Sequence, residues 1–324
     1  DNNWSATRPH PLASGTKSFT GVIAMFAVQD GLITLDELAS DTITEWKDDP
    51  DRSRITVRHL LTLASGLDPL DAELGGRGGS RMLGDVARQR ADRLKLDDQP
   101  RVADHYPAAI AARAVSAPGE RFRYGPSHFY AFAALLERRL AKSDLPHKTV
   151  LDYLHARLFD PIGLQVARFG RDAAGRPNLP GGCMLTAREW AKFGEFIRLG
   201  GAWPQPDGQA KQLLRSDLLA ECFKPSAANP HYGLTWWLGG GDPTGQADGA
   251  APDAQPQPDA RQRRQLEQVP SLRTDDGRAI RVWMAAGLGK QRLYILPDQQ
   301  LVIVRFAEAT RDGQGFRDEQ FLRL

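Results

Sequence analysis

The C-terminal part of the chain constrains the fold most strongly, because its pattern changes there from helical to β-type. Three apolar runs with the length of strands lie at 279–285, 292–296 and 301–306, and Pro297-Asp298 supplies a turn between the last two. The preceding part has mostly helical patterns, interrupted by glycine and proline turns. We therefore expect an α+β fold, in which an antiparallel sheet is flanked by helices and joined to a mostly helical region.

Length and charge narrow the possible classes of protein. A chain of 324 residues can bury a large core, and although length alone allows one or two domains, we expect a single domain over 1–324. The formal net charge is +2, from 42 basic and 40 acidic residues, so nothing indicates binding to nucleic acid. No apolar run of about 18 residues and no leader pattern occur, so we expect neither membrane insertion nor a signal peptide. The oligomeric state stays open.

The stretch Ser14-Gly15-Thr16-Lys17 places a hydroxyl and an amine three residues apart, ahead of an almost wholly apolar run. If a helix begins at Ser14, Ser14 Oγ and Lys17 Nζ share a face and can approach hydrogen-bonding distance. A serine needs a neighbouring base to act as a nucleophile, and apolar surroundings would lower the pKa of a lysine enough to make it one. The helix start also offers free N–H groups to an oxyanion.

The same motif has a purely structural interpretation. Ser-x-x-Lys is a loose pattern, serine is a common N-cap and lysine a common surface residue. The apolar residues that follow Lys17 argue against a solvated face, and the rest of the chain has to decide between the two interpretations.

A second informative stretch is 118–140. Pro118-Gly119 marks a turn, and Tyr124-Gly125-Pro126 cannot lie inside a helix, so Tyr124 is expected on a loop just before a helix capped by Ser127. A phenol there can project into a cleft and relay protons, or it can simply pack at a turn. His59, within a helix expected to stop at Gly66, is interpreted as a hydrogen-bonding structural residue.

The remaining segments supply further expectations. Trp236 and Trp237 can line a substrate cleft or pack in the core, and Cys183 and Cys222 are expected to be buried free thiols, although one disulfide is possible. Residues 74–105 are interpreted as an exposed excursion with one helix, and 239–265 as a long flexible loop. Helices are also expected at 14–30, 32–46, 149–160 and 186–200, the last capped by Thr186.

Taken together, these residues resemble the serine hydrolases of the β-lactamase-like fold, which include class C β-lactamases, DD-peptidases, carboxylesterases and 6-aminohexanoate-dimer hydrolases. The resemblance runs from about residue 12 to the end. It is carried, in the family's order, by the Ser-x-x-Lys motif, by the runs at 31–36 and 55–67, by Pro118-Gly119 with Phe122 and Tyr124, and by the strands from Trp283 to Arg305.

The resemblance implies roles for individual residues. Ser14 would be the nucleophile that forms an acyl-enzyme, Lys17 its base, and Tyr124 the group that returns a proton to the leaving group. The oxyanion hole would consist of the backbone amides of Ser14 and Leu288. Gly287, Trp236 and Ser127 would contact substrate in the cleft. No cofactor and no metal are implied, the partner is a small-molecule ester or amide, and a periplasmic or secreted location is favoured.

Departures from the family pattern indicate which branch of the family the chain resembles. The β-lactamase motif Tyr-x-Asn has Pro126 at its third position, and the usual Lys-Thr-Gly is replaced by Ala285-Ala286-Gly287 followed by Leu288. These changes favour the esterase and 6-aminohexanoate-dimer hydrolase branch. A β-lactamase or DD-peptidase remains an alternative, as does a non-catalytic binding or sensor protein. Only 13 residues precede Ser14, so we expect the N-terminal strands of the family to be lacking.

Overall fold

Four antiparallel strands form the main sheet of the computed structural model, which describes residues 5–70, 74, 103–240, 269–307 and 316–323. Their order is β11-β10-β9-β6. Leu293 in the central strand β10 pairs with Ala285 of β9 on one side and with Val304 of β11 on the other. The strands are β6 (Trp237–Gly239), β9 (Val282–Gly287), β10 (Gln291–Leu296) and β11 (Leu301–Arg305).

Strand β10 is buried along its whole length because elements cover both faces of the sheet. On one face, Leu293 and Val302 approach Gly194 of α8 (Ala187–Arg198). On the other face, Tyr294 reaches Asp318 of α11 (Asp318–Phe321). Alternate side chains of a strand point to opposite faces, and this alternation gives the sheet its two covered sides.

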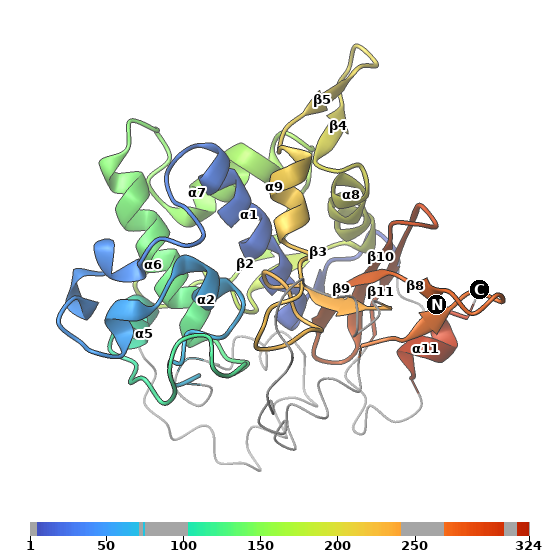
Figure 1. Cartoon of the computed structure of the whole chain (residues 1–324). Helices are drawn as coiled ribbons and strands as arrows, with labels where there is room; N and C mark the ends of the chain where they lie inside the picture. The colour runs from blue at the N-terminus through green and yellow to red at the C-terminus, as the bar shows by residue number, and fades with distance from the viewer. Residues whose placement is uncertain (1–4, 71–73, 75–102, 241–268, 308–315, 324) are drawn as a thin grey trace.

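Helix α1 (Ser18–Gln29) is the central helix of the molecule. Every residue from Ser18 to Ala27 is buried, and an apolar surface on all sides is typical of a helix enclosed by other elements. In Figure 1, α1 lies between the helical region containing α2, α5 and α6 and the sheet formed by β9, β10 and β11. The predicted end near Asp30-Gly31 is confirmed, since Asp30 is the C-cap and Gly31 has a φ of 70°.

The other elements are short, except for α6. The α-helices are α2 (Val57–Leu61), α5 (His105–Ile110), α6 (Ser127–Lys142), α7 (Val150–Leu154), which continues as a π-helical segment (His155–Phe159), and α9 (Ser216–Glu221). The 3-10 helices are η1 (Ala13–Lys17), η2 (Ala39–Asp41), η3 (Thr44–Trp46) and η4 (Arg52–Arg54). The small sheets contain β1 (His10–Pro11), β3 (Cys183–Leu185) and β2 (Arg168–Phe169) in that spatial order, the pair β4 (Ala202–Pro204) and β5 (Ala210–Gln212), and the pair β7 (Leu272–Arg273) and β8 (Ala279–Ile280).

The predicted α+β class is confirmed, whereas several boundaries were wrong. The segment 279–285 is two strands, β8 and the start of β9, rather than one. The segment 32–46 forms the 3-10 turns η2 and η3 instead of a helix, and α2 stops at Leu61 rather than near Gly66, with Leu63 at a φ of 56°. Most of 74–105 and of 239–265 lies outside the described residues, although Gly239 belongs to β6.

The structure also shows the state of the two cysteines and the character of the described helices. Cys183 and Cys222 are both free and buried, as expected. In the part of the chain that the structure describes, no helix combines the length and the apolar character needed to cross a membrane.

Candidate active site

Ser14 and Lys17 lie in the 3-10 turn η1, directly before α1. Lys17 Nζ donates a hydrogen bond to Ser14 Oγ at 3.2 Å. In a 3-10 helix the side chains at i and i+3 eclipse one another, which explains why a spacing of three brings the two groups together. Ser14 is partly exposed, whereas Lys17 is only 6% exposed. The α-helix itself begins at Ser18, four residues later than expected.

Contacts from distant parts of the chain hold this turn in place. Ala13 has a φ of 47°, in the left-handed region that costs a non-glycine residue roughly 1–2 kcal/mol. Thr16 Oγ1 donates to the carbonyl of Ala13 at 2.7 Å and accepts from the amide of Cys183 at 3.1 Å. Gly15 packs against Trp190, so close that an added Cβ would lie 2.7 Å from the indole ring. The conformation therefore depends on tertiary packing.

The amine of Lys17 lies between the serine hydroxyl and an aromatic wall. Its Nζ donates to the carbonyl of Pro180 at 2.6 Å, and it lies 4.9 Å from the ring centre of Tyr124 and 5.2 Å from that of Phe129. The structure thus brings Tyr124 next to the Ser14–Lys17 pair, although 107 residues separate Tyr124 from Lys17 in the sequence.

Tyr124 lies on the loop that leads into α6, with its ring packed against other aromatic side chains. It stacks on Trp237 at a centroid distance of 5.8 Å and meets Tyr232 edge-on at 6.5 Å. Gly125 follows because no side chain fits there: an added Cβ would lie 2.3 Å from Cβ of Pro69. Rigid packing of this kind can hold a phenol at a fixed position.

A buried histidine fixes the backbone just before Tyr124. His128 Nε2 lies 2.8 Å from the carbonyl of Arg123, and His128 Nδ1 lies 2.8 Å from Ser65 Oγ. Because a carbonyl only accepts, Nε2 carries the proton, and Nδ1 accepts from the serine hydroxyl. Burial lowers the pKa of His128 to about 4, so the ring is neutral in the folded protein near pH 7.

The end of β9 packs against the other side of the nucleophile turn. Gly287 approaches the carbonyl of Leu12 so closely that an added Cβ would lie 2.0 Å from the oxygen. Leu288 follows at the tip of the β9–β10 hairpin and is 60% exposed. Ser14 lies near the N-terminal end of η1, where backbone N–H groups lack partners within the helix. These two backbone segments are the expected sources of the oxyanion donors.

Three other residues named from the sequence have structural positions instead of lining a cleft. Trp236 is completely buried between Phe193 and Phe223, with centroid distances of 5.9 Å and 5.4 Å, so it is a core residue and does not line a cleft. Ser127 is also completely buried at the first position of α6, where it neither faces an open cleft nor caps the helix. His59 accepts from the amide of Thr56 through Nδ1, which confirms its structural role.

Sequence reasoning missed the carbonyl of Pro180 and the histidine that holds the Tyr124 loop. The Pro180 contact is made by backbone 163 residues from Lys17, and no side-chain motif signals it. The histidine has a weak signal, since His128 lies four residues after Tyr124 and within an otherwise apolar stretch.

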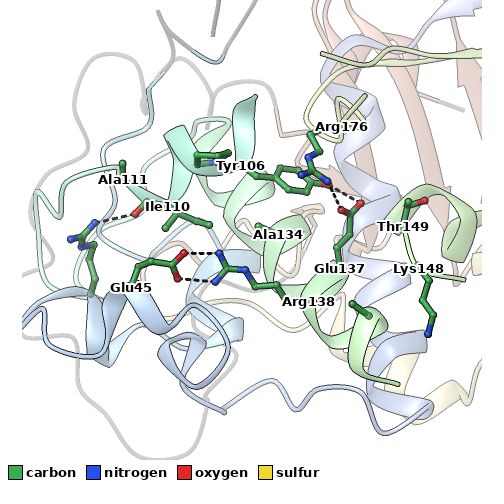
Figure 2. Close-up of a pocket in the computed structure, with 13 residues that line it drawn as sticks. Glu45, Tyr106, Ile110, Ala111, Ala134, Glu137, Arg138, Lys148, Thr149 and Arg176 are labelled. Carbon is green, nitrogen blue, oxygen red and sulfur yellow. Dashed lines mark hydrogen bonds and ion pairs between the residues drawn. The ribbon is translucent and has the colours of Figure 1, made fainter. Parts of the chain in front are cut away.

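A separate hollow of about 750 Å³ lies between α5, α6 and η3 (Figure 2). None of the residues that line it belongs to the Ser14 site. Its carboxylates are already paired, Glu45 with Arg138 at 2.7 Å and Glu137 with Arg176 at 3.1 Å. We therefore assign no catalytic part to this hollow.

Comparisons with known proteins find similarity of sequence to a protein family and to an esterase. The model of the Beta-lactamase family matches residues 1–324. Lovastatin esterase of Penicillium rubens is 28% identical over 182 residues, which cover 49% of this chain but only 39% of the esterase. The match thus spans about two fifths of the length of that relative.

Two solved structures share the fold. A protein of Bacillus anthracis designated a 6-aminohexanoate-dimer hydrolase has a TM-score of 0.63 at 20% identity, over 96% of this chain and 70% of its own. An octameric penicillin-binding protein homologue from Pyrococcus abyssi has a TM-score of 0.62 at 15% identity, over 94% and 63% of the two chains. At such low identity these similarities show a common fold alone.

Proposed function

Because this chain belongs to the beta-lactamase family, whose members are hydrolytic enzymes, we propose that it is a serine hydrolase that cleaves an ester or amide through an acyl-enzyme. The observation that carries the proposal is the hydrogen bond of 3.2 Å between the buried amine of Lys17 and the partly exposed hydroxyl of Ser14. A nucleophile and a base within hydrogen-bonding reach are what acyl transfer to a serine requires.

In the acylation step, Ser14 Oγ attacks the carbonyl carbon of the substrate while Lys17 Nζ, as the general base, takes the hydroxyl proton. The π electrons of the carbonyl move onto its oxygen, which the amides of Ser14 and Leu288 stabilise. Removing one such donor typically costs about 100- to 1000-fold in rate. The tetrahedral intermediate then expels the alcohol or amine, which takes a proton relayed by the phenol of Tyr124.

In the deacylation step, water attacks the acyl carbon and loses a proton to Lys17 Nζ. The ester bond to Ser14 breaks, the carboxylic acid leaves, and Ser14 regains its proton. Each proton transfer runs among groups of the Ser14–Lys17–Tyr124 cluster, which is consistent with the 4.9 Å between Lys17 Nζ and the tyrosine ring.

We favour an esterase-like activity over β-lactam hydrolysis. The strand beside Ser14 carries Ala285-Ala286-Gly287, with no lysine at the motif position, and Pro126 stands where β-lactamases have an asparagine amide. The partial match to an esterase named for lovastatin points in the same direction and supports a small-molecule ester as the first class of substrate to try.

The test combines an active-site label with turnover. Intact-protein mass after treatment with a fluorophosphonate, together with hydrolysis of p-nitrophenyl acetate and butyrate, is measured for the wild type, Ser14→Ala and Ser18→Ala. We expect one adduct and turnover in the wild type, neither in Ser14→Ala, and both in Ser18→Ala. A folded wild type that gives no adduct and no turnover would contradict the proposal and favour a binding or sensor protein. Faster hydrolysis of a chromogenic cephalosporin than of esters would favour a β-lactamase.

A further inference from the structure

Side chains from the neighbouring strands hold every carbonyl of the turn between β9 and β10. The turn covers Gly287 to Lys290, and Gly289 and Lys290 have φ values of 78° and 62°. Glycine adopts such a φ freely, whereas a lysine keeps it only where the surrounding structure holds the turn. The donors are Arg292 Nη1 to the carbonyl of Gly287 (3.3 Å), Gln291 Nε2 to those of Leu288 (3.2 Å) and Gly289 (3.4 Å), and Arg305 Nη1 to that of Lys290 (2.8 Å).

The side chain of Gln291 contacts both the turn and the segment that follows β11. It is completely buried at the start of β10. Besides its contacts with the turn, its Nε2 donates to the carbonyl of Ala307 at 2.6 Å and its Oε1 accepts from the amide of Ala307 at 2.9 Å. The amide group therefore ties the turn to the chain just beyond β11, and both of its polar atoms are engaged.

Arg292 is itself held by α11, on the face of the sheet opposite to α8. It is 1% exposed, and its Nε contacts Asp318 of α11 at 2.7 Å. Tyr294 donates to the same carboxylate at 2.6 Å. Although burial alone would raise the pKa of Asp318, the charges and hydrogen bonds of Arg292, Tyr294 and Lys290 hold that pKa below its ordinary value. The ionised carboxylate fixes the guanidinium, and the guanidinium reaches the turn.

Geometry links these contacts to catalysis. In a trans peptide the C=O of one residue and the N–H of the next point in opposite directions. The bond from Arg292 to the Gly287 carbonyl therefore directs the Leu288 N–H away from the guanidinium. The same peptide lies beside the nucleophile turn, because Gly287 packs on the carbonyl of Leu12, two residues before Ser14.

We propose that Gln291 and the Arg292–Asp318 pair are positioning residues, which hold the Gly287–Lys290 turn so that the Leu288 amide can donate to the substrate oxyanion. The inference rests on the proposed serine hydrolase function. It goes beyond that function because it predicts that the buried side chains of Gln291, Arg292 and Asp318 affect the rate of the reaction.

The test compares Gln291→Met and Arg292→Lys with the control Arg157→Lys. Methionine keeps the size of glutamine but lacks its hydrogen bonds, and lysine cannot reproduce the fork that reaches both Asp318 and the turn. Arg157 makes an ion pair of the same length, 2.7 Å, with Asp30 at the end of α1, although this pair is more exposed and remote in sequence from the turn. For each variant, kcat and KM on p-nitrophenyl butyrate, the affinity for a trifluoromethyl ketone and the thermal midpoint are measured.

The ketone separates positioning from a general structural role, since its adduct with Ser14 carries an oxyanion that needs the same donors. We expect a loss of about 10- to 100-fold in kcat and a parallel loss of ketone affinity in both test variants, with KM nearly unchanged. The Arg157→Lys protein should keep both values. Wild-type kcat and ketone affinity in a folded Gln291→Met or Arg292→Lys protein would overturn the inference, and so would equal losses in the control.

Failure of this inference can be told apart from failure of the proposed function. The Ser14→Ala protein is assayed in the same series. If it is inactive while Gln291→Met behaves as wild type, the serine hydrolase stands and only the positioning role is wrong. If Ser14→Ala retains activity, the proposed function is wrong. If both test variants fail to fold, Asp318→Asn replaces them, and wild-type kcat and ketone affinity in that protein would overturn the inference.

Discussion

Lowering the pH from 7 to 5 should destabilise the protein by about 2 kcal/mol through His128 alone. The ring is completely buried, with both nitrogens hydrogen-bonded in the neutral form. Burial lowers its pKa from the ordinary 6.5 to about 4. The unfolded chain therefore takes up a proton at a pH at which the folded protein does not.

The size of the effect follows from these two pKa values. Because the folded pKa is the lower one, the full stability is present above about pH 6.5 and is lost as the pH falls toward 4. Linkage gives about 2 kcal/mol between pH 7 and pH 5, and about 3 kcal/mol by pH 4. Most of the loss between pH 7 and pH 5 comes from protonation of the unfolded chain.

The assay is urea unfolding of the wild type and of His128→Gln at pH 7 and pH 5. Glutamine can still donate to the carbonyl of Arg123 but does not titrate. The difference in unfolding free energy between the two pH values should be about 2 kcal/mol larger in the wild type. An NMR titration of the native protein should show no protonation of His128 above about pH 5. Equal pH dependence in the two proteins, or a native titration near pH 6.5, would refute the reasoning.

Three further results are expected. Gly287→Ala should lose both activity and thermal stability, because the added methyl group would lie 2.0 Å from the Leu12 carbonyl oxygen; an active protein with an unchanged midpoint would contradict this packing. Asp318→Asn should reduce the loss of stability on acidification. The pKa of Asp318 is lowered in the folded protein, so its carboxylate stabilises the fold at pH values above 3.8, the ordinary pKa, and this contribution is lost as the pH falls further. Melting temperatures that shift equally between pH 5 and pH 3 in the wild type and the variant would argue against this. Cys183 and Cys222 should react with a thiol reagent only on unfolding, because both are buried and burial raises the pKa of each thiol; fast labelling of the native protein would exclude this.

Features with a local signal were predictable from the sequence. Thr186 caps α8 by accepting from the amide of Glu189, as the spacing of three residues indicated. The turn at Pro297-Asp298 separates β10 from β11 as expected. The family was also predictable, because its motifs occur in a fixed order along the chain, and the match over residues 1–324 confirms it. The roles of Ser14, Lys17 and Tyr124 remain predictions.

Features that depend on distant contacts were not predictable. Trp236 and Trp237 are neighbours in a strand-like run, and nothing local indicates that Trp236 enters the core while Trp237 stacks on Tyr124. The 3-10 form of the nucleophile turn depends on Trp190 and on the amide of Cys183, both more than 160 residues away. Tertiary packing overrode the preference of 14–17 for a regular helix start.

The left-handed conformation of Ala13 implies that the reactive arrangement exists only in the folded molecule. An isolated peptide with this sequence would relax to an ordinary φ and separate Ser14 from the surroundings that activate it. A helix corresponding to α1 could persist in a partly unfolded state without restoring that geometry. Reaction with a fluorophosphonate would therefore count native molecules in a mixed population, and the serine would serve as a built-in reporter of correct folding.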